Sequence, residues 1–157
     1  MNTNDEYNLN RFIEAQEDDY EIALSEVRNG RKETHWMWYI FPQITGLGMS
    51  PIAQYFEIKS LEEARAYLND EVLGAHLLEI TNALLELETD DPIEVFGGVD
   101  ALKLKSSMTL FDYVSNDEIF NRVLDKYYHG EKDLKTIGIC DGLKGVAFYP
   151  KLKKGGI

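Results

Sequence analysis

The residues best suited to chemistry lie in one stretch, where basic side chains run directly into an aromatic segment. Arg31 and Lys32 precede His35, and Trp36 and Trp38 follow it. Indole rings can stack on a planar ligand, and cations can hold its anionic groups. This combination predicts a site for a nucleotide-like anion. His35 is the candidate catalytic residue, because an imidazole can act as acid or base near neutral pH.

The same segment has a second interpretation, in which both tryptophans belong to the hydrophobic core. Residues 36–41 are hydrophobic without a break, so their spacing does not separate an inner face from an outer one. Pro42 disfavours helical geometry at the preceding residue, so the segment is expected to be buried and either helical or extended. Trp36 and Trp38 are therefore either ligand-stacking residues or core residues.

A second polar cluster lies in a helical pattern further along the chain, where Lys103, Lys105 and Ser106 are followed by Ser107 and Thr109. Residues three and four apart are neighbours on a helix, so these side chains could complete an anion site if they face the first basic cluster. The alternative is that the lysines are simply solvated. The predicted ligand-binding set is Arg31, Lys32, His35, Trp36, Trp38, Gln43, Lys103, Lys105 and Ser106.

Other chemical classes lack their usual signatures. The chain has no phosphate-binding loop, no dinucleotide fingerprint and no paired histidines of a zinc protease. His35, His76 and His129 have no His or Cys three or four residues away, so neither a metal nor a cofactor is predicted. His76 and His129 are expected at the surface. The single Cys140 is interpreted as a small buried residue, in keeping with a reducing compartment.

The charge of the chain argues against duplex nucleic acid as a partner. Sixteen basic and 28 acidic residues give a formal net charge of -12, whereas binding to a phosphate backbone depends on Lys and Arg. Three basic clusters nevertheless interrupt the acidic chain, at residues 28–35, 102–111 and 144–157. The first residues lack the pattern of a secretory signal, and no apolar run is long enough for a membrane span, so we expect a cytoplasmic protein without a membrane partner.

Periodicity predicts an all-α fold, a compact single-domain bundle of about six or seven short helices. Apolar residues recur every three or four positions in the first helix, expected over residues 8–28, and Gly30 is expected to end it in a left-handed conformation. Ser60 and Glu63 match a capping box, and Asp100 and Asn116 are expected to cap later helices. The helical domain is predicted over residues 1–140. Residues 141–157 form a Gly- and Lys-rich tail, expected to be flexible or to hold a short strand at 146–149.

Many of these residues together resemble the bacterial family known as domain of unknown function 1810, some members of which carry the label calpastatin. The resemblance covers about residues 8–137. It rests on Tyr20, Ala23, Leu24, Glu26, Arg28, residues 30–32, 35–43 and 46–48, Ser50, Pro51, Glu63, Ala64, residues 66–68, Phe96, Gly97 and residues 103–111. It implies a compact, mostly helical fold and no particular activity. The pairing of a tryptophan with a later helix containing Lys, Thr and Phe is also similar to NADAR proteins of ADP-ribose metabolism, which suggests a ligand class.

Two functions remain open from the sequence. The first is a site that binds a nucleotide or ADP-ribose-like anion and hydrolyses it with His35. The second is a noncatalytic module that binds a protein partner through its aromatic segment and acidic helices. A concave, cation-lined pocket beside His35 would favour the first, whereas a closed core beneath a flat apolar patch would favour the second.

Overall fold

The computed structural model describes residues 5–148, which form eight helices joined by loops. The helices are α1 (Asn10–Arg28), α2 (Met37–Ile40), α3 (Pro51–Phe56), α4 (Leu61–Asn69), α5 (Leu73–Glu86), α6 (Pro92–Val114), α7 (Ile119–Tyr128) and α8 (Leu134–Phe148). Within this range the only β-type pairing is an isolated parallel bridge between Ile44 and Ile58. The predicted all-α fold is confirmed, with one helix more than the upper end of the prediction.

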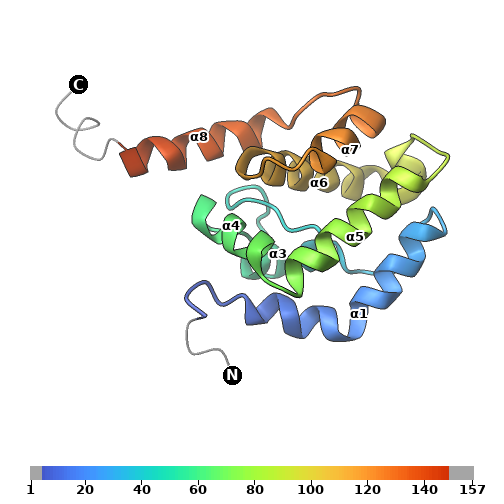
Figure 1. The fold of residues 1–157 in the computed structure, drawn as a ribbon, viewed down its shortest axis with the longest axis horizontal. Helices are drawn as coiled ribbons and strands as arrows, with labels where there is room; N and C mark the ends of the chain where they lie inside the picture. The colour runs from blue at the N-terminus through green and yellow to red at the C-terminus, as the bar shows by residue number, and fades with distance from the viewer. Residues whose placement is uncertain (1–4, 149–157) are drawn as a thin grey trace.

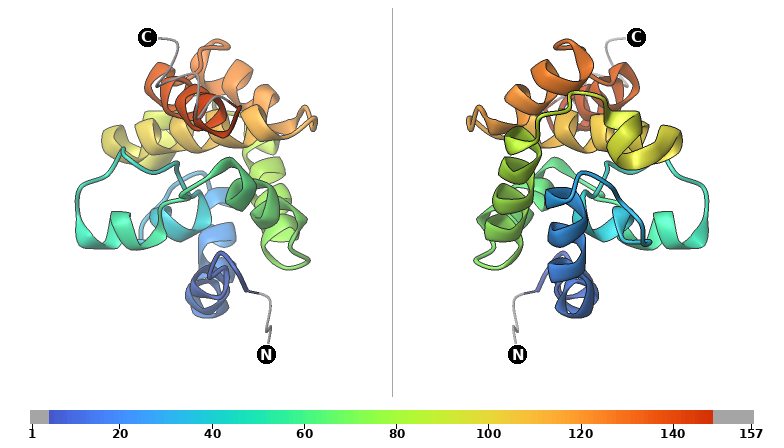
Figure 2. Two further views of the ribbon diagram at one scale, coloured as in Figure 1. Left: turned by 90° about the vertical axis from the view of Figure 1, so that its left-hand side faces the viewer. Right: turned by 90° about the vertical axis from the view of Figure 1, so that its right-hand side faces the viewer.

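The helices are arranged in two tiers, which the perpendicular views of Figure 2 separate clearly. Helices α6, α7 and α8 make up the upper tier, and α1 lies at the opposite, lower edge (Figure 1). Helix α5 runs obliquely between them and contacts both α1 and α7. The aromatic segment that contains α2 contacts α1 and α3, so it lies inside the lower tier.

Helix α1 follows its predicted apolar stripe. Its buried side chains recur every three or four residues, namely Arg11, Phe12, Gln16, Tyr20, Ala23, Leu24 and Val27. The helix ends as predicted: Gly30 has a φ of 78°, and the amide of Arg31 donates to the carbonyl of Glu26 at 3.0 Å, as in a Schellman motif. This ending turns the chain sharply and points the first basic cluster toward α6.

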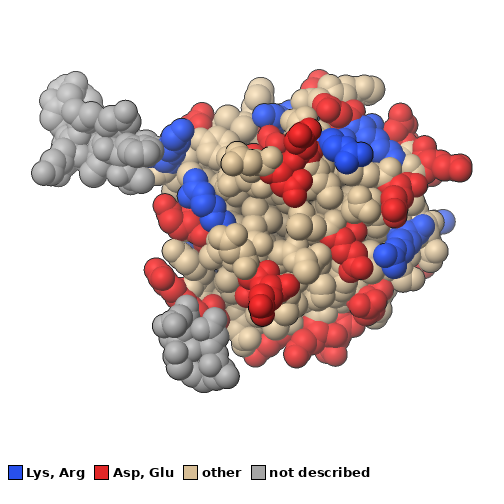
Figure 3. Space-filling view, in the orientation of Figure 1, with Lys and Arg blue, Asp and Glu red and all other residues tan. Residues whose placement is uncertain are grey.

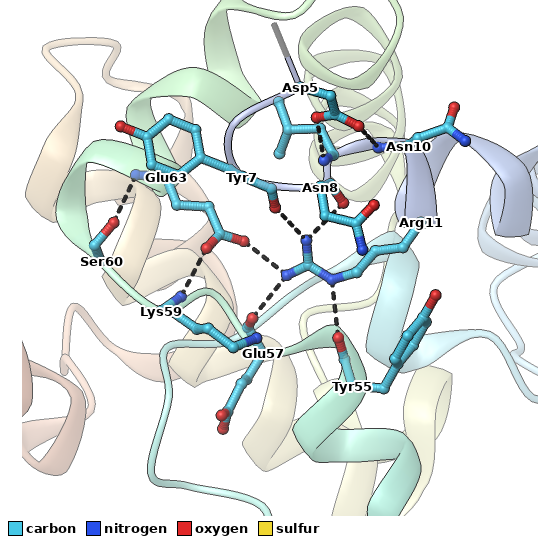
Figure 4. A network of polar contacts seen from close by, with 11 residues as sticks. Asp5, Tyr7, Asn8, Asn10, Arg11, Tyr55, Glu57, Lys59, Ser60 and Glu63 are labelled. Carbon is cyan, nitrogen blue, oxygen red and sulfur yellow. Dashed lines mark hydrogen bonds and ion pairs between the residues drawn. The ribbon is translucent and has the colours of Figure 1, made fainter. Parts of the chain in front are cut away.

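A buried ion pair ties α1 to α4 (Figure 4). Arg11 Nη2 lies 2.7 Å from Glu63 Oε2, and both side chains are only 3% exposed. The remaining guanidinium donors of Arg11 bind the carbonyls of Tyr7, Asn8, Tyr55 and Glu57. The capping box forms in part, because Ser60 Oγ accepts from the Glu63 amide, whereas Glu63 accepts from the Lys59 amide. Every donor of Arg11 is used, so this cluster holds the fold together.

Three local predictions differ from the structure. Asp100 does not cap a helix; α6 continues from Pro92 through a kink at Gly97, where φ is 78°. Asn116 is not the cap of α7, since the amide of Ile119 donates to Asp117 Oδ1 instead. The strand expected at 146–149 is helical where it is described, because α8 runs to Phe148. Residues 149–157, the rest of the predicted tail, lie outside the described residues.

Candidate functional site

Trp36 belongs to the core. Its side chain is 1% exposed and packs against Phe41 and Phe96, with ring centroids 6.3 Å away in each case. Its indole Nε1 donates to Glu26 Oε1 at 2.8 Å. A buried indole needs such a partner for its N–H, and α1 supplies it. Trp36 is therefore a core residue and cannot stack on a ligand in this structure.

Glu26 organises the loop that carries the first basic cluster. Its carboxylate accepts from the amides of Glu33 and Thr34, from the hydroxyl of Thr34 and from the indole of Trp36. Burial alone would raise the pKa of Glu26, but these hydrogen bonds favour the ionised form and bring the pKa below its ordinary value. The carboxylate thus fixes residues 33–36 and, with them, the position of Lys32.

Lys32 turns inward from this loop and is only 7% exposed at its side chain. Its backbone amide donates to the Val95 carbonyl at 2.7 Å, which joins the loop to α6. Its ammonium group donates to the Thr34 carbonyl at 2.6 Å and lies 2.9 Å from Asp100 Oδ2. The same nitrogen lies 4.9 Å from the ring centre of Trp36. Lys32 is therefore held by several partners at once.

The two basic clusters meet at Asp100. Asp100 Oδ1 lies 3.5 Å from the ammonium of Lys103, one turn further along α6, while Oδ2 binds Lys32. The Lys103 ammonium also lies 4.8 Å from the ring centre of Trp38, which is half-buried. One carboxylate thus links two ammonium groups, and each ammonium covers one of the two tryptophans.

Gln43 lies close to Trp38. The two residues border a very small hollow with Ile44, Gly48 and Phe56. The carbonyl of Gln43 accepts from the Ile58 amide at 2.8 Å, which fixes the chain as it leaves the aromatic segment. Trp38 therefore borders this hollow with Gln43 and also contacts the Lys103 ammonium.

A larger hollow opens next to Lys32. It has a volume of about 580 Å³ and is bordered by residues 29–32 on one side and 93–97 on the other. Arg31 is exposed at its edge, and Glu94 supplies an opposing carboxylate. The positive φ angles of Gly30 and Gly97 give the two walls their sharp turns. Lys32 borders this hollow and also binds Asp100, so Lys32 links the hollow to Asp100 and, through it, to Lys103.

His35 lies beside these groups but is exposed. Within residues 5–148, its imidazole makes no hydrogen bond, although its backbone carbonyl accepts from the Tyr39 hydroxyl at 3.1 Å. That hydroxyl also donates to Asp19. Burial, followed by the bond to Asp19, raises the pKa of Tyr39, so this phenol stays protonated. The contacts around His35 position the backbone and leave its ring free.

Lys105 and Ser106 lie away from the first basic cluster, contrary to the predicted grouping. The Lys105 ammonium is 3.4 Å from Glu131, and Ser106 Oγ donates to Asp133 Oδ2 at 3.2 Å. The reason is helical geometry: residues two apart point about 200° away from each other, so Lys103 and Lys105 cannot face the same site. Ser106 and Thr109 instead form hydrogen bonds with Asp133, at its carboxylate and its amide respectively. The Asp133 carboxylate also accepts from the Thr136 amide in the first turn of α8.

Two contributors were missed by the sequence prediction. Asp100 was expected to cap a helix, and Glu26 was named only among the residues that carry the family resemblance. A usable signal existed for Asp100, which lies three residues before Lys103, a spacing that pairs charges on a helix. No local signal identifies Glu26, because its partners are seven to ten residues away across a turn.

His76, expected at the surface, is only partly exposed. Its ring stacks on Tyr20 with centroids 3.6 Å apart, and its Nδ1 lies 2.7 Å from Gln16 Oε1. Gln16 Nε2 donates to the Tyr39 carbonyl and the Tyr67 hydroxyl, so Oε1 must accept and His76 Nδ1 must carry the proton. Burial lowers the pKa of His76, which favours this neutral form.

The part of the chain that the structure describes contains no group of three or more His, Cys, Asp or Glu side chains placed to hold a metal ion. No helix within that part is both long enough and apolar enough to cross a membrane. Burial raises the pKa of the Cys140 thiol to about 11, so the thiol is unreactive at neutral pH.

We take the group formed by Lys32, Asp100 and Lys103, together with Trp38, as the candidate site, because it joins the two basic clusters.

The fold and the motif residues described above are those of a small, all-α protein family. Residues 6–140 match the model of the family described as "Protein of unknown function (DUF1810)", and the chain belongs to this family. It is similar to the crystal structure of the conserved hypothetical protein Rv1873 from Mycobacterium tuberculosis, with a TM-score of 0.86 and 43% identity. That match covers 87% of this chain and 99% of the other. No curated protein matches the chain.

Proposed function

We propose that this protein binds a small nucleotide-like anion, such as a mononucleotide or an ADP-ribose-like molecule, beside Lys103 and Trp38. The observation that carries the proposal is that Lys32 and Lys103 share the single carboxylate of Asp100. Two ammonium groups and one carboxylate leave one positive charge in a chain whose net charge is -12. A local cation of this kind, next to a half-buried indole, suits a ligand with both a planar ring and an anionic group.

The two lysines have different tasks in this proposal. The Lys32 ammonium is occupied by the Thr34 carbonyl, Asp100 and the Trp36 ring. Lys103 has a longer contact with Asp100 and otherwise lies over the Trp38 ring. Lys32 therefore neutralises Asp100, which leaves the Lys103 ammonium available for an anionic ligand.

Trp38 provides the platform for the planar part of the ligand. A bound base would replace the Lys103 ammonium on the face of the indole, and the ammonium would then turn toward the ligand phosphate. Base–aromatic stacking contributes about 1–3 kcal/mol. The hollow beside Lys32, at about 580 Å³, lies within the range of roughly 300–1,000 Å³ that is usual for small-molecule sites. It offers Arg31 to a second anionic group.

Binding is supported better than hydrolysis. General acid–base catalysis needs a side chain held within hydrogen-bond reach of the reacting atoms. The His35 ring is exposed and has no hydrogen-bond partner among residues 5–148 that would fix its orientation. The proposal is therefore restricted to binding, and His35 enters it as a side chain at the edge of the site.

A thermal-shift panel of mononucleotides, dinucleotides and ADP-ribose tests the proposal. A ligand at 100 times its dissociation constant adds about 2.7 kcal/mol to the free energy of unfolding, a readily measured shift. Lys103→Gln should weaken binding about tenfold or more, because it removes a charged hydrogen-bond donor. Lys105→Gln is the matched control on the same helix and should bind like wild type. A panel without any shift, or equal binding by the two variants, would refute the proposal.

A protein-docking role is the second candidate, and exposed apolar side chains on the first half of α6 favour it. Ile93, Val99 and Leu102 are 61%, 70% and 67% exposed. Neighbouring exposed apolar groups commonly mark interaction surfaces. Affinity capture that recovers one partner with wild type and loses it with Leu102→Asp would support this role. A panel of captured proteins that does not change with Leu102→Asp would exclude it.

A further inference from the structure

A second hollow lies at the far end of α6, away from Lys103 and Trp38. It has a volume of about 310 Å³ and lies between α4, α5 and the link from α6 to α7. Val114, which borders it, is eleven residues beyond Lys103, or about 16 Å further along the helix. The two sites share no residue.

Four of the eight residues that line this hollow are apolar. Leu68 of α4, Leu78 of α5, Val114 of α6 and Phe120 of α7 line it. Phe120 is fully buried, whereas Leu78 is 38% exposed at the edge. Four helices thus present apolar carbon to a concave surface, which is the usual character of a small-molecule site.

One cation stands at the rim. Arg65 is exposed on α4, and among residues 5–148 its guanidinium forms no ion pair. Arg65 also borders a separate hollow of about 300 Å³, together with Leu61, Tyr113, Leu143 and Lys144. Arg65 therefore borders both hollows, and among residues 5–148 its guanidinium donors make no hydrogen bond.

One acid, Asp117, also lines this hollow and is already engaged. The carboxylate of Asp117 accepts from the amide of Ile119 at 3.0 Å, and Ser115 Oγ accepts from the amide of Asp117 at 2.9 Å. Asp117 therefore caps α7. Its charge disfavours a doubly charged ligand at this rim, and Arg65 alone matches a single negative charge.

We infer that this hollow binds a small amphipathic carboxylate. The carboxylate pairs with the guanidinium of Arg65, which can donate two parallel hydrogen bonds to it. The hydrocarbon body lies on Leu68, Leu78, Val114 and Phe120. The volume, near the lower end of the range for ligand sites, selects a short molecule over a dinucleotide.

A titration with linear carboxylates of increasing length, from butanoate to decanoate, tests the inference. Affinity should rise about threefold to fourfold per added methylene until the hollow is filled, as expected for burial of each CH₂. Octanol, which has no charge, should bind at least tenfold more weakly than octanoate. Chemical-shift changes of backbone amides should centre on residues 114–120.

Two variants make the test specific. Arg65→Gln should weaken octanoate about tenfold, while Arg122→Gln, which removes an exposed arginine of α7 that borders neither hollow, should leave affinity unchanged. Thermal denaturation of both variants should match wild type, which separates lost binding from lost folding. No binding at millimolar octanoate, no dependence on chain length, or equal affinity of the two variants would overturn the inference.

Discussion

Several side chains that stabilise this protein bind partners that are distant in the sequence. Arg11 shows this most clearly, since its guanidinium binds four backbone carbonyls and the carboxylate of Glu63, 52 residues away. Periodicity places Arg11 beside the apolar stripe of α1 but does not reveal its partners. A buried charge of this kind is stable only when every donor is satisfied.

Removal of that charge should be strongly destabilising. Arg11→Met should lower the free energy of unfolding by about 3–5 kcal/mol, because Glu63 would remain buried and unpaired. Arg28→Met is the control, since Arg28 lies 4.0 Å from Glu79 and both side chains are at least half exposed. Such a surface pair contributes about 0–1 kcal/mol. Urea denaturation measures both, and equal losses would contradict the assigned role of Arg11.

Glu26 makes the stability of the protein depend on pH. Its pKa lies below the ordinary 4.5 in the folded state, so its contribution is complete above about pH 4.5 and is lost as the pH falls through the lower, folded value. The stability difference between wild type and Glu26→Gln should therefore shrink below pH 4.5. Glu17→Gln, at an exposed residue of α1, is the control for removal of a negative charge from the same helix, and it should change the stability at neutral pH only slightly. A pH-independent difference for Glu26→Gln would refute the assignment.

Among the helices, the elements that depend on local pattern were predicted best. The stripe of α1, the left-handed Gly30 and the start of α3 at Pro51 all follow from residues close in sequence. The sequence likewise singles out the basic and aromatic residues of the first cluster. It does not reveal how the two clusters contact each other, because Asp100 joins Lys32 across 68 positions and Lys105 points away from Lys103. Long-range pairing and helix orientation depend on packing that no local pattern records.

The packing of α4 against α5 depends on a glycine. A Cβ added to Gly74 would lie 2.1 Å from the Leu68 carbonyl oxygen, so the backbone would have to move. Gly74→Ala should lower the free energy of unfolding by about 1–3 kcal/mol. Gly138→Ala in α8, where no atom lies within 4 Å of the new Cβ, should raise it by about 0.5–1 kcal/mol. Thermal denaturation shows whether each substitution raises or lowers the stability. If Gly74→Ala stabilises the protein, the backbone of Gly74 does not lie as close to the Leu68 carbonyl as described.

The molecule as a whole carries an excess of negative charge. Figure 3 shows acidic side chains along its lower and right-hand edges, with basic side chains in smaller separate groups. A net charge of -12 disfavours the compact state through repulsion, which salt screens over roughly 8–10 Å at physiological ionic strength. The melting temperature should therefore rise between low salt and about 0.15 M sodium chloride. A melting temperature that falls over this range would mean that attractive surface pairs dominate.

The same charge disfavours an anionic ligand wherever no cation is available to pair with it, which is why Lys103 and Lys32 matter. Within residues 5–148, these two lysines and Asp100 join the two basic segments of the sequence in space. The half-buried Trp38 is the other tryptophan of the chain besides the buried Trp36. A ligand that stacks at the site must therefore change the environment of Trp38 specifically.

Titration of intrinsic tryptophan fluorescence with ADP-ribose tests the central claim most directly. Stacking of the adenine on Trp38 should quench the fluorescence of wild type in a saturable manner, and ribose 5-phosphate, which lacks the base, should not. In Trp38→Phe the quenching should disappear, because Trp36 is buried at 1% exposure and remains shielded. Saturable quenching that persists unchanged in Trp38→Phe, or no quenching in wild type, would contradict a nucleotide-like ligand at this site.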